Sequence, residues 1–297
     1  MGRLSAADFH PEVLKLFDQY VHGAISRRGF IDGAARHATA GITSASLLLA
    51  LSPDFALGRQ VDPQDPRIEA RRVEHPSPQG YGRVQGYLVR PAQATRQKLP
   101  TVLVVHENRG LNPHIEDVAR RLALEGFIAY APDALAPLGG YPGDEDRARE
   151  LFPQLDQGKT REDFLAAHGY LKALAGGNGQ VGAVGFCYGG GIVNFLATRL
   201  PGLKAGVPFY GAQPPAEEAA RIKAPLLLHY AGTDERINAG WPPYEAALKA
   251  AGVAYEAHVY PGVQHGFNND TTPRYDEAAA KLAWQRTVAF FQRTLQA

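Results

Sequence analysis

The chain has 297 residues, 45% of them hydrophobic and 21% charged, with a net charge of +1, which is enough for one large α/β domain or two small ones. This balance, without a basic run between aromatic residues, argues against nucleic acid and anionic membranes as partners, and no long apolar stretch predicts a transmembrane helix. A single cysteine excludes an internal disulfide and a metal cluster built from cysteines.

The first sixty residues differ from the rest. Residues 1–25 are predicted to form an amphipathic helical extension. Residues 26–60 begin with the sequence SRRGFI, which resembles a twin-arginine export motif, and continue with a mildly apolar stretch and small residues suited to cleavage. This pattern predicts export to the periplasm or beyond. The alternative is a retained helical arm over residues 28–50 of a cytoplasmic protein, packed on the domain or on a second subunit.

The remaining residues show alternating strand and helix patterns. Residues 61–80 are polar and proline-rich and are predicted to be a linker, and residues 81–297 form the main domain. Strands are expected at residues 82–89, 101–105, 127–131, 181–186, 205–210, 225–230 and 255–260. Helices are expected at 115–125, within 156–174, and at 190–199, 242–251 and 275–295. The pattern predicts an α/β fold with a mostly parallel central sheet and helices on both faces.

The sequence GFCYGGG at residues 185–191 follows a short apolar strand and leads into a helix. Glycines around one nucleophile at a sharp strand-to-helix turn are typical of a nucleophile elbow, here with Cys187 in the nucleophile position. The helix N-terminus beneath the side chain favours a thiolate. The alternative is a glycine-rich turn with a buried, unreactive cysteine.

Two further strand ends carry polar residues in the order that the elbow requires. Asp234 follows the strand at 225–230, and His265 follows the strand at 255–260. The order of nucleophile, acid and histidine is that of α/β-hydrolases. His265 would accept the thiol proton and protonate the leaving group, and Asp234 would orient its ring. Taken singly, Asp234 is also compatible with an Asx turn and His265 with a hydrogen-bonded loop residue.

The loop after the strand at 101–105 offers oxyanion and carboxylate groups. The backbone N–H groups of Asn108 and Tyr188 are expected to form an oxyanion hole. Glu107 is expected near the thiol, with a salt bridge to Arg109 as the alternative. The ten histidines show no metal-ligand spacing, so neither a metal nor a cofactor is predicted.

From about Arg71 onward the sequence resembles the dienelactone hydrolase family, the carboxymethylenebutenolidases. The resemblance rests on residues 185–190, His106-Glu107, Asp133, residues 232–234 and residues 265–267. It implies an α/β-hydrolase fold, a Cys-His-Asp triad and a glutamate, here Glu107, that holds the thiol in check until substrate displaces it.

The resemblance also marks a departure at the substrate site. Family members that act on dienelactone have an arginine four residues after the catalytic histidine, where this sequence has Asn269. Arg109, Phe267 and Asn269 are therefore the predicted substrate-binding residues. Other arginines that could bind a substrate carboxylate in place of the missing one are Arg147, Arg149 and Arg274.

The predicted function is hydrolysis of small lactones or esters through a thioester acyl-enzyme, without a cofactor. The predicted partner is therefore a small-molecule ester or lactone. A broad carboxylesterase without a dienelactone role is the alternative that Asn269 favours. A non-catalytic binding protein with the same fold is a third possibility, against which the complete triad argues.

Overall fold

A single eight-stranded sheet forms the centre of the molecule. The computed structural model describes residues 3–38, 42–93 and 98–296. The strands lie in the order β1-β2-β4-β3-β5-β6-β7-β8. Their bounds are β1 (Ile68–Ser77), β2 (Gly82–Pro91), β3 (Leu99–Val105), β4 (Ile128–Pro132), β5 (Gly177–Phe186), β6 (Ala205–Phe209), β7 (Leu226–Ala231) and β8 (Tyr255–Tyr260). Strands β3 to β8 run parallel to one another, so their carboxyl ends lie at one edge of the sheet. Strand β2 runs antiparallel to both of its neighbours, β1 and β4.

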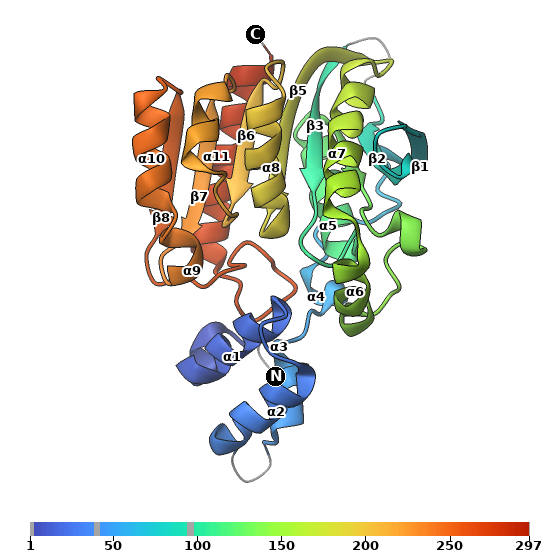
Figure 1. The fold of residues 1–297 in the computed structure, drawn as a ribbon. Coiled ribbons are helices and arrows are strands. Elements are labelled where there is room, and N and C mark those ends of the chain that lie inside the picture. The colour runs from blue at the N-terminus through green and yellow to red at the C-terminus, as the bar shows by residue number, and fades with distance from the viewer. Residues whose placement is uncertain (1–2, 39–41, 94–97, 297) are drawn as a thin grey trace.

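Helices cover both faces of this sheet, as the sequence predicts (Figure 1). Helices α5 (Pro113–Leu124) and α11 (Glu277–Leu295) pack into the apolar core of one face. Helices α7 (Gln157–Lys172), α8 (Tyr188–Arg199) and α10 (Trp241–Ala250) pack into the core of the other. The shorter helical elements of the domain are η3 (Ala136–Leu138), α6 (Glu145–Leu151), η4 (Phe152–Gln154), η5 (Ala216–Arg221) and α9 (Glu235–Asn238).

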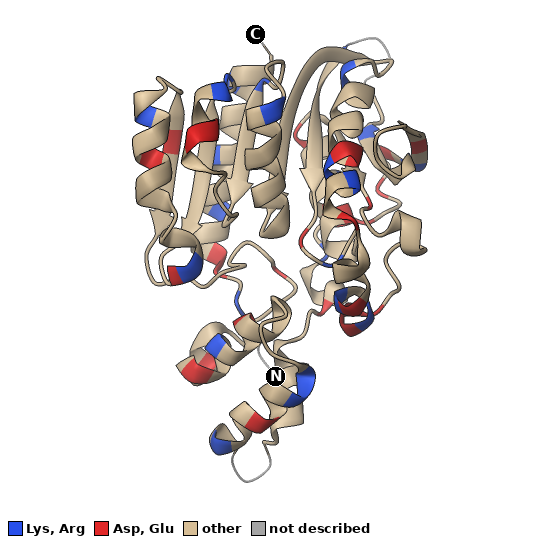
Figure 2. Cartoon of the chain, viewed as in Figure 1, with Lys and Arg blue, Asp and Glu red and all other residues tan. Residues whose placement is uncertain are grey.

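The five central strands carry no Lys, Arg, Asp or Glu. These residues lie on the helices, the loops and the outer strands, and the visible central strands β3, β5, β6 and β7 are tan (Figure 2). The side chains of residues 102–105 in β3 are fully buried. Because both faces of the sheet are covered, a charged side chain in these strands would be buried without water, which strongly disfavours it.

Strand β1 lies where the sequence predicts a linker. Residues 68–77 pair antiparallel with β2 over their whole length. The pairing carries ion pairs across the two strands, with Arg90 and Glu69 2.6 Å apart and Arg83 and Glu74 also 2.6 Å apart. An edge strand of this kind tolerates charges on most positions, so it lacks the apolar alternation by which strands are recognised.

The N-terminal residues form a separate group of helices at the carboxyl edge of the sheet (Figure 1). They are η1 (Ala6–Asp8), α1 (Pro11–Val21), α2 (Arg27–Ala34), η2 (Ala35–His37), α3 (Ser44–Leu51) and α4 (Phe55–Gly58). Helices α1 to α3 share their own apolar cluster, which contains Phe17, Phe30 and Leu51. We call α1 to α3, with the turn between α1 and α2, the N-terminal cap. Among the described residues, no helix combines the length and apolar character needed to cross a membrane.

Polar contacts fasten the N-terminal cap to the α/β domain. Tyr20 of α1 donates a hydrogen bond to Asp146 of α6, and Arg27 of α2 pairs with the same carboxylate. The backbone carbonyl of Val21 accepts hydrogen bonds from Asn108 at 2.9 Å and Arg109 at 3.0 Å. The end of α1 is therefore held directly against the loop that follows β3.

Strand β5 and helix α8 are joined by a single residue, Cys187, and glycines allow the close packing around it. A Cβ at Gly185 would lie 2.1 Å from the carbonyl oxygen of Gly189. A Cβ at Gly189 would lie 2.2 Å from the carbonyl oxygen of Val105 in β3. Since backbone atoms cannot rotate away, no residue with a Cβ fits either position in this turn.

We predict that Gly185→Ala destabilises the protein by about 3 kcal/mol or more, because its methyl group would overlap backbone. Urea unfolding monitored by circular dichroism measures this free energy. Gly169→Ala is the matched control, because Gly169 lies inside α7 with no atom within 4 Å of the added methyl group. That variant is expected to be as stable as the parent or more stable by up to about 1 kcal/mol. Equal stability of the two variants would contradict the packing described for the turn.

Candidate active site

The side chain of Cys187 stands at the carboxyl edge of the sheet on a strained turn. Its φ of 55° and ψ of −112° lie in a region that residues with a Cβ rarely adopt. Its N–H donates to the carbonyl of Phe209 at 3.1 Å, which fixes the turn against β6. Cys187 is also the N-cap residue of the twelve-residue helix α8, so its sulfur lies at the positive end of that helix. This is the elbow that the glycine pattern predicts.

His265 and Asp234 meet beside this turn. Nδ1 of His265 lies 2.5 Å from Oδ2 of Asp234, and both side chains are buried. The other oxygen of Asp234 accepts the N–H of Ile237 at 3.2 Å and so begins α9. Nε2 of His265 is buried and has no hydrogen-bond partner among the described residues. A nitrogen of His265 lies within 4.8 Å of Cys187 Sγ, so the geometry brings together the three residues predicted as a triad.

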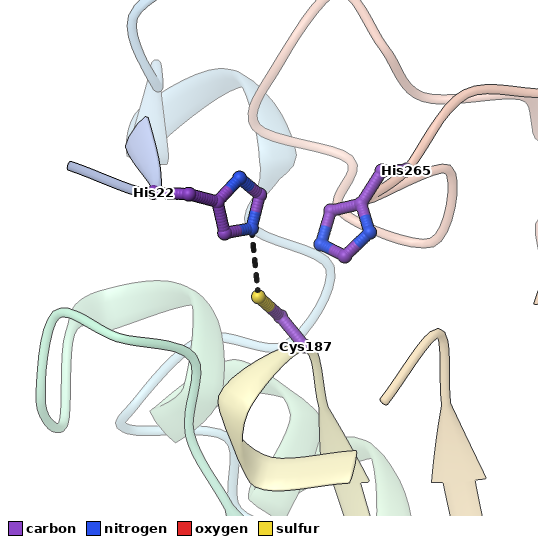
Figure 3. Close-up of side chains that lie close together, drawn as sticks. All are labelled: His22, Cys187 and His265. Atoms are coloured by element: carbon purple, nitrogen blue, oxygen red, sulfur yellow. Dashed lines mark hydrogen bonds between the residues drawn. The ribbon is translucent and has the colours of Figure 1, made fainter. Parts of the chain in front are cut away.

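A second histidine, which the sequence analysis missed, contacts the same sulfur. Nε2 of His22, directly after α1, lies 3.3 Å from Cys187 Sγ, whereas His265 makes no hydrogen bond to it (Figure 3). Nδ1 of His22 lies 2.7 Å from the carbonyl oxygen of Asp18 and 3.3 Å from its carboxylate. No motif marks His22 in the sequence, because its position depends on how the N-terminal cap packs.

The charges around Cys187 favour its thiolate. Burial opposes ionisation, but the positive charges of His265 and His22 and the hydrogen bond with His22 together lower the pKa of Cys187 to about 5. Burial likewise opposes the charged form of His22, but the sulfur and Asp18 raise its pKa to about 10. The same balance, with the sulfur and Asp234 as partners, raises the pKa of His265. The two histidines therefore favour the thiolate form of Cys187.

Glu107 and Asn269, both predicted site residues, hydrogen-bond to each other. Asn269 donates from Nδ2 to Oε2 of Glu107 at 3.0 Å, and its own oxygen accepts from Thr271. Both residues line a narrow cavity of about 60 Å³ that also contains Cys187. Asn269 therefore holds the carboxylate of Glu107 by a hydrogen bond. The control of the Cys187 thiol by Glu107 stays a prediction.

Of the other predicted site residues, two line a cavity and two are buried. Asn108 and Tyr188 line a second cavity next to Cys187, of about 510 Å³. Arg109 is buried, with its guanidinium donating to the carbonyls of Asn108 and Val21. Phe267 was predicted to bind substrate, and that prediction is wrong, because its ring is fully buried. That ring packs in an aromatic cluster with Tyr260, Tyr210 and Phe209.

The cavity of about 510 Å³ opens beside the sulfur and is large enough for a small ester or lactone. His22, Cys187 and His265 are among the residues that line it. Its other walls combine apolar side chains with three arginines that the sequence analysis did not select, Arg161, Arg199 and Arg236. Arg199 lies 3.5 Å from Glu218, whereas Arg236 lies 3.2 Å from Nε2 of His22. Arg236 is thus the cavity arginine that contacts a residue beside the nucleophile.

The chain matches two family models. One, described as the dienelactone hydrolase family, matches residues 84–295, which span the sheet from β2 onward and the elbow. The other, described as YqhI-like, matches residues 1–38, which carry α1 and α2 of the N-terminal cap.

Individual relatives agree with the first of these matches. A Salmonella typhi protein described as a carboxymethylenebutenolidase is 36% identical over 225 residues, covering 69% of this chain and 81% of that protein. A hydrolase fragment of Escherichia coli K12, YghX, is 55% identical over 115 residues, which is 39% of this chain and 97% of the fragment. A Klebsiella pneumoniae structure described as a dienelactone hydrolase is 31% identical, with a TM-score of 0.66, and the match covers 76% of this chain and 99% of that one.

We predict that Cys187 is alkylated by iodoacetamide at a rate that stays high as the pH falls and halves near pH 5. The sign follows from the lowered pKa, because the reactive thiolate persists until the pH reaches that value. An ordinary cysteine thiol, with a pKa of roughly 8.5, would lose its reactivity well above neutrality. Mass spectrometry of quenched samples gives the rate, and Cys187→Ser, which leaves no cysteine, is the blank. A rate that climbs between about pH 7 and pH 9 would contradict the electrostatics of the site.

Proposed function

Because the chain belongs to the dienelactone hydrolase family, a family of carboxylic ester hydrolases, we propose that it cleaves small lactones or esters with Cys187, His265 and Asp234 as its catalytic triad. The resemblance seen in the sequence is thus confirmed, and the triad and the substrate are our proposal. The observation that supports the triad best is the convergence of the Cys187 sulfur and the His265–Asp234 pair from three separate strand ends.

The proposed chemistry begins with attack of the Cys187 thiolate on the carbonyl carbon. The oxygen of the tetrahedral intermediate is stabilised by the N–H groups of Asn108 and Tyr188 and by the N-terminus of α8. The carbon–oxygen bond then breaks, and His265 gives its proton to the leaving oxygen, leaving a thioester. His265 next takes a proton from water, whose oxygen attacks the thioester and releases the acid and the thiolate.

Asp234 has two tasks in this scheme. Its carboxylate holds Nδ1 of His265 at 2.5 Å, so that Nε2 faces the reacting atoms. It also offsets the positive charge that His265 carries between the two proton transfers. Both tasks need the acceptor oxygen of a carboxylate and its negative charge.

We predict that Cys187→Ala abolishes hydrolysis of dienelactone and p-nitrophenyl acetate, and that Asp234→Asn lowers kcat about 10³- to 10⁴-fold. The loss in Asp234→Asn is expected because an amide neither charges nor correctly orients His265. Steady-state kinetics measure both effects. Asp276→Asn is the matched control: Asp276 caps α11 through the N–H of Ala279, as Asp234 caps α9, but lies outside the triad. Undiminished turnover by Cys187→Ala would overturn the proposed mechanism.

We propose Arg236 as the group that binds a substrate carboxylate. Asn269, at the position of the family's substrate-binding arginine, is occupied with Glu107 and Thr271. Arg109 is buried against Val21, and the side chain of Arg199 lies near Glu218. Arg236 is exposed in the wall of the cavity that contains the sulfur and lies 3.2 Å from Nε2 of His22, so a substrate carboxylate can reach it.

We predict that Arg236→Gln raises KM for dienelactone about 10- to 100-fold and changes KM for the neutral ester p-nitrophenyl acetate little. The neutral ester is the internal standard, because it shares every step except recognition of a carboxylate. Arg293→Gln, an exposed arginine of α11 paired with Glu256, is the control substitution. Equal changes in KM for both substrates would favour the alternative function, a broad carboxylesterase. That outcome would agree with the asparagine at position 269, where the family has an arginine, and with the apolar side chains of the cavity.

Export is proposed from the sequence at residues 26–31. Cleavage near residue 58 would remove the N-terminal cap, including His22 and its contact with the sulfur. The first residue of the protein purified from its source decides between a cleaved signal and a retained cytoplasmic arm. A start at Met1 or Gly2 would exclude cleavage.

A further inference from the structure

Cys187 lies between two histidines, and each histidine has its own aspartate. His265 is paired with Asp234 in the α/β domain, and His22 is paired with Asp18 in the N-terminal cap. We propose that His22, oriented by Asp18, holds the sulfur of Cys187 as a thiolate in the resting enzyme and leaves His265 free to transfer protons to the leaving oxygen and from water. This inference rests on the proposed hydrolase function and on retention of the N-terminal cap, and it adds a catalytic residue from outside the matched hydrolase segment.

The contacts of His22 determine what each ring nitrogen does. Nδ1 lies 2.7 Å from the carbonyl oxygen of Asp18, so Nδ1 must carry a proton and donate it. Nε2 is then the nitrogen that takes the proton of the Cys187 thiol, 3.3 Å away. The Asp18 carboxylate, 3.3 Å from Nδ1, stabilises the imidazolium that results. His265 likewise has an aspartate at its Nδ1, although there the carboxylate of Asp234 is the hydrogen-bond partner, and both rings lie beside the sulfur (Figure 3).

The charged groups that face His22 come from four elements. The Cys187 thiolate from the elbow and Asp18 from α1 favour its positive charge. Arg236 of α9, 3.2 Å from Nε2, and His265, with ring centroids 4.7 Å apart, oppose it. The two anions contact the ring directly and raise the pKa of His22 to about 10 against the effect of burial, whereas the guanidinium of Arg236 donates toward Nε2 and competes with a proton there. The contact with His22, together with Arg274 at 3.7 Å, lowers the pKa of the Asp18 carboxyl in spite of its burial.

The hydrogen-bond pattern around the sulfur indicates that the two histidines have different tasks. The Cys187 sulfur has its hydrogen bond with His22, while the buried Nε2 of His265 has no partner among the described residues. When the thiol ionises, its proton moves to His22 and stays there. In each turnover His265 loses one proton to the leaving oxygen and regains one from water, so ester and water give acid and alcohol and both histidines end as they began.

The N-terminal cap is fastened where this role requires it. The carbonyl of Val21, the residue before His22, accepts hydrogen bonds from Asn108 and Arg109. The same loop after β3 supplies a proposed oxyanion-hole N–H group at Asn108. The loop after β3 therefore positions His22 through its hydrogen bonds to Val21.

The test uses the full-length protein and the variants His22→Asn and Asp18→Asn. We expect His22→Asn to raise the pH midpoint of iodoacetamide alkylation by at least about one unit and to lower kcat/KM for p-nitrophenyl acetate about 10-fold or more at neutral pH. Asp18→Asn, which keeps the ring and the backbone carbonyl, should shift the midpoint in the same direction by less. All buffers contain a chelator, so that trace metal ions do not block the thiol.

His10→Asn is the matched control, because His10 lies in the same segment and caps α1 through the N–H of Glu12, a task that asparagine also performs. It should leave the midpoint and kcat/KM unchanged. His22→Ala provides a second readout, because added imidazole should restore part of its activity if the missing group is the ring itself. A merely structural role for His22 would lower the thermal midpoint without moving the alkylation profile or allowing this rescue.

The two proposals fail in different ways. An unchanged alkylation midpoint in both His22→Asn and Asp18→Asn, with Cys187→Ala inactive, would overturn the role of His22 and leave the triad standing. Full activity of Cys187→Ala would overturn the hydrolase mechanism itself. A raised midpoint in His22→Asn with rescue of His22→Ala by imidazole would support the inference.

Discussion

The turn at Cys187 places the strictest constraint on the backbone of this protein. Strand β5 passes into α8 through one residue with a positive φ, and the chain closes against itself at Gly185 and Gly189. That close approach sets the sulfur above the carboxyl edge of the sheet, at the N-terminus of a helix. The loops after β3, β7 and β8 emerge at the same edge, so Glu107, Asp234 and His265 can all reach the site. The geometry of the site depends on this one turn.

Stabilising a charged sulfur in a buried position requires positive charge close by, and the fold supplies it twice. Burial alone would raise the pKa of Cys187, but His265 and His22 beside the sulfur lower that pKa to about 5. Each ring in turn needs a carboxylate, which Asp234 and Asp18 provide. The result is an alternating cluster of positive and negative groups in which removing any one group leaves its neighbours uncompensated, so their effects are not additive.

The sequence predicted the parts of the fold and site that follow from local spacing. Strands β3 to β7 contain apolar runs, β8 alternates apolar and polar residues, and Cys187, Asp234 and His265 follow the ends of three of these strands. Strand β1 was missed, because its charged residues pair across an exposed edge and leave no apolar alternation. Phe267 was predicted to bind substrate, yet the chain turns its ring into the core.

His22 and Arg236 could not have been found in this way. His22 lies 165 positions from Cys187 in the chain and reaches it only because the cap docks on the loop after β3. Arg236 follows Asp234 by two residues, and only the turn into α9 shows that its side chain enters the cavity wall. Contacts of this kind depend on how separate segments pack, and a single sequence carries no spacing rule for them.

The position of the lone cysteine between distant parts of the chain has a consequence during synthesis. A ribosome makes His22 first, Cys187 much later and His265 later still. The helices of the cap have their own apolar cluster and can associate early, but the sulfur gains its full set of neighbours only when the loop after β8 has docked. A nascent chain therefore carries Cys187 as an ordinary, weakly nucleophilic thiol. The thiol becomes reactive only in the folded protein. This order limits its reaction with oxidants and other electrophiles during synthesis.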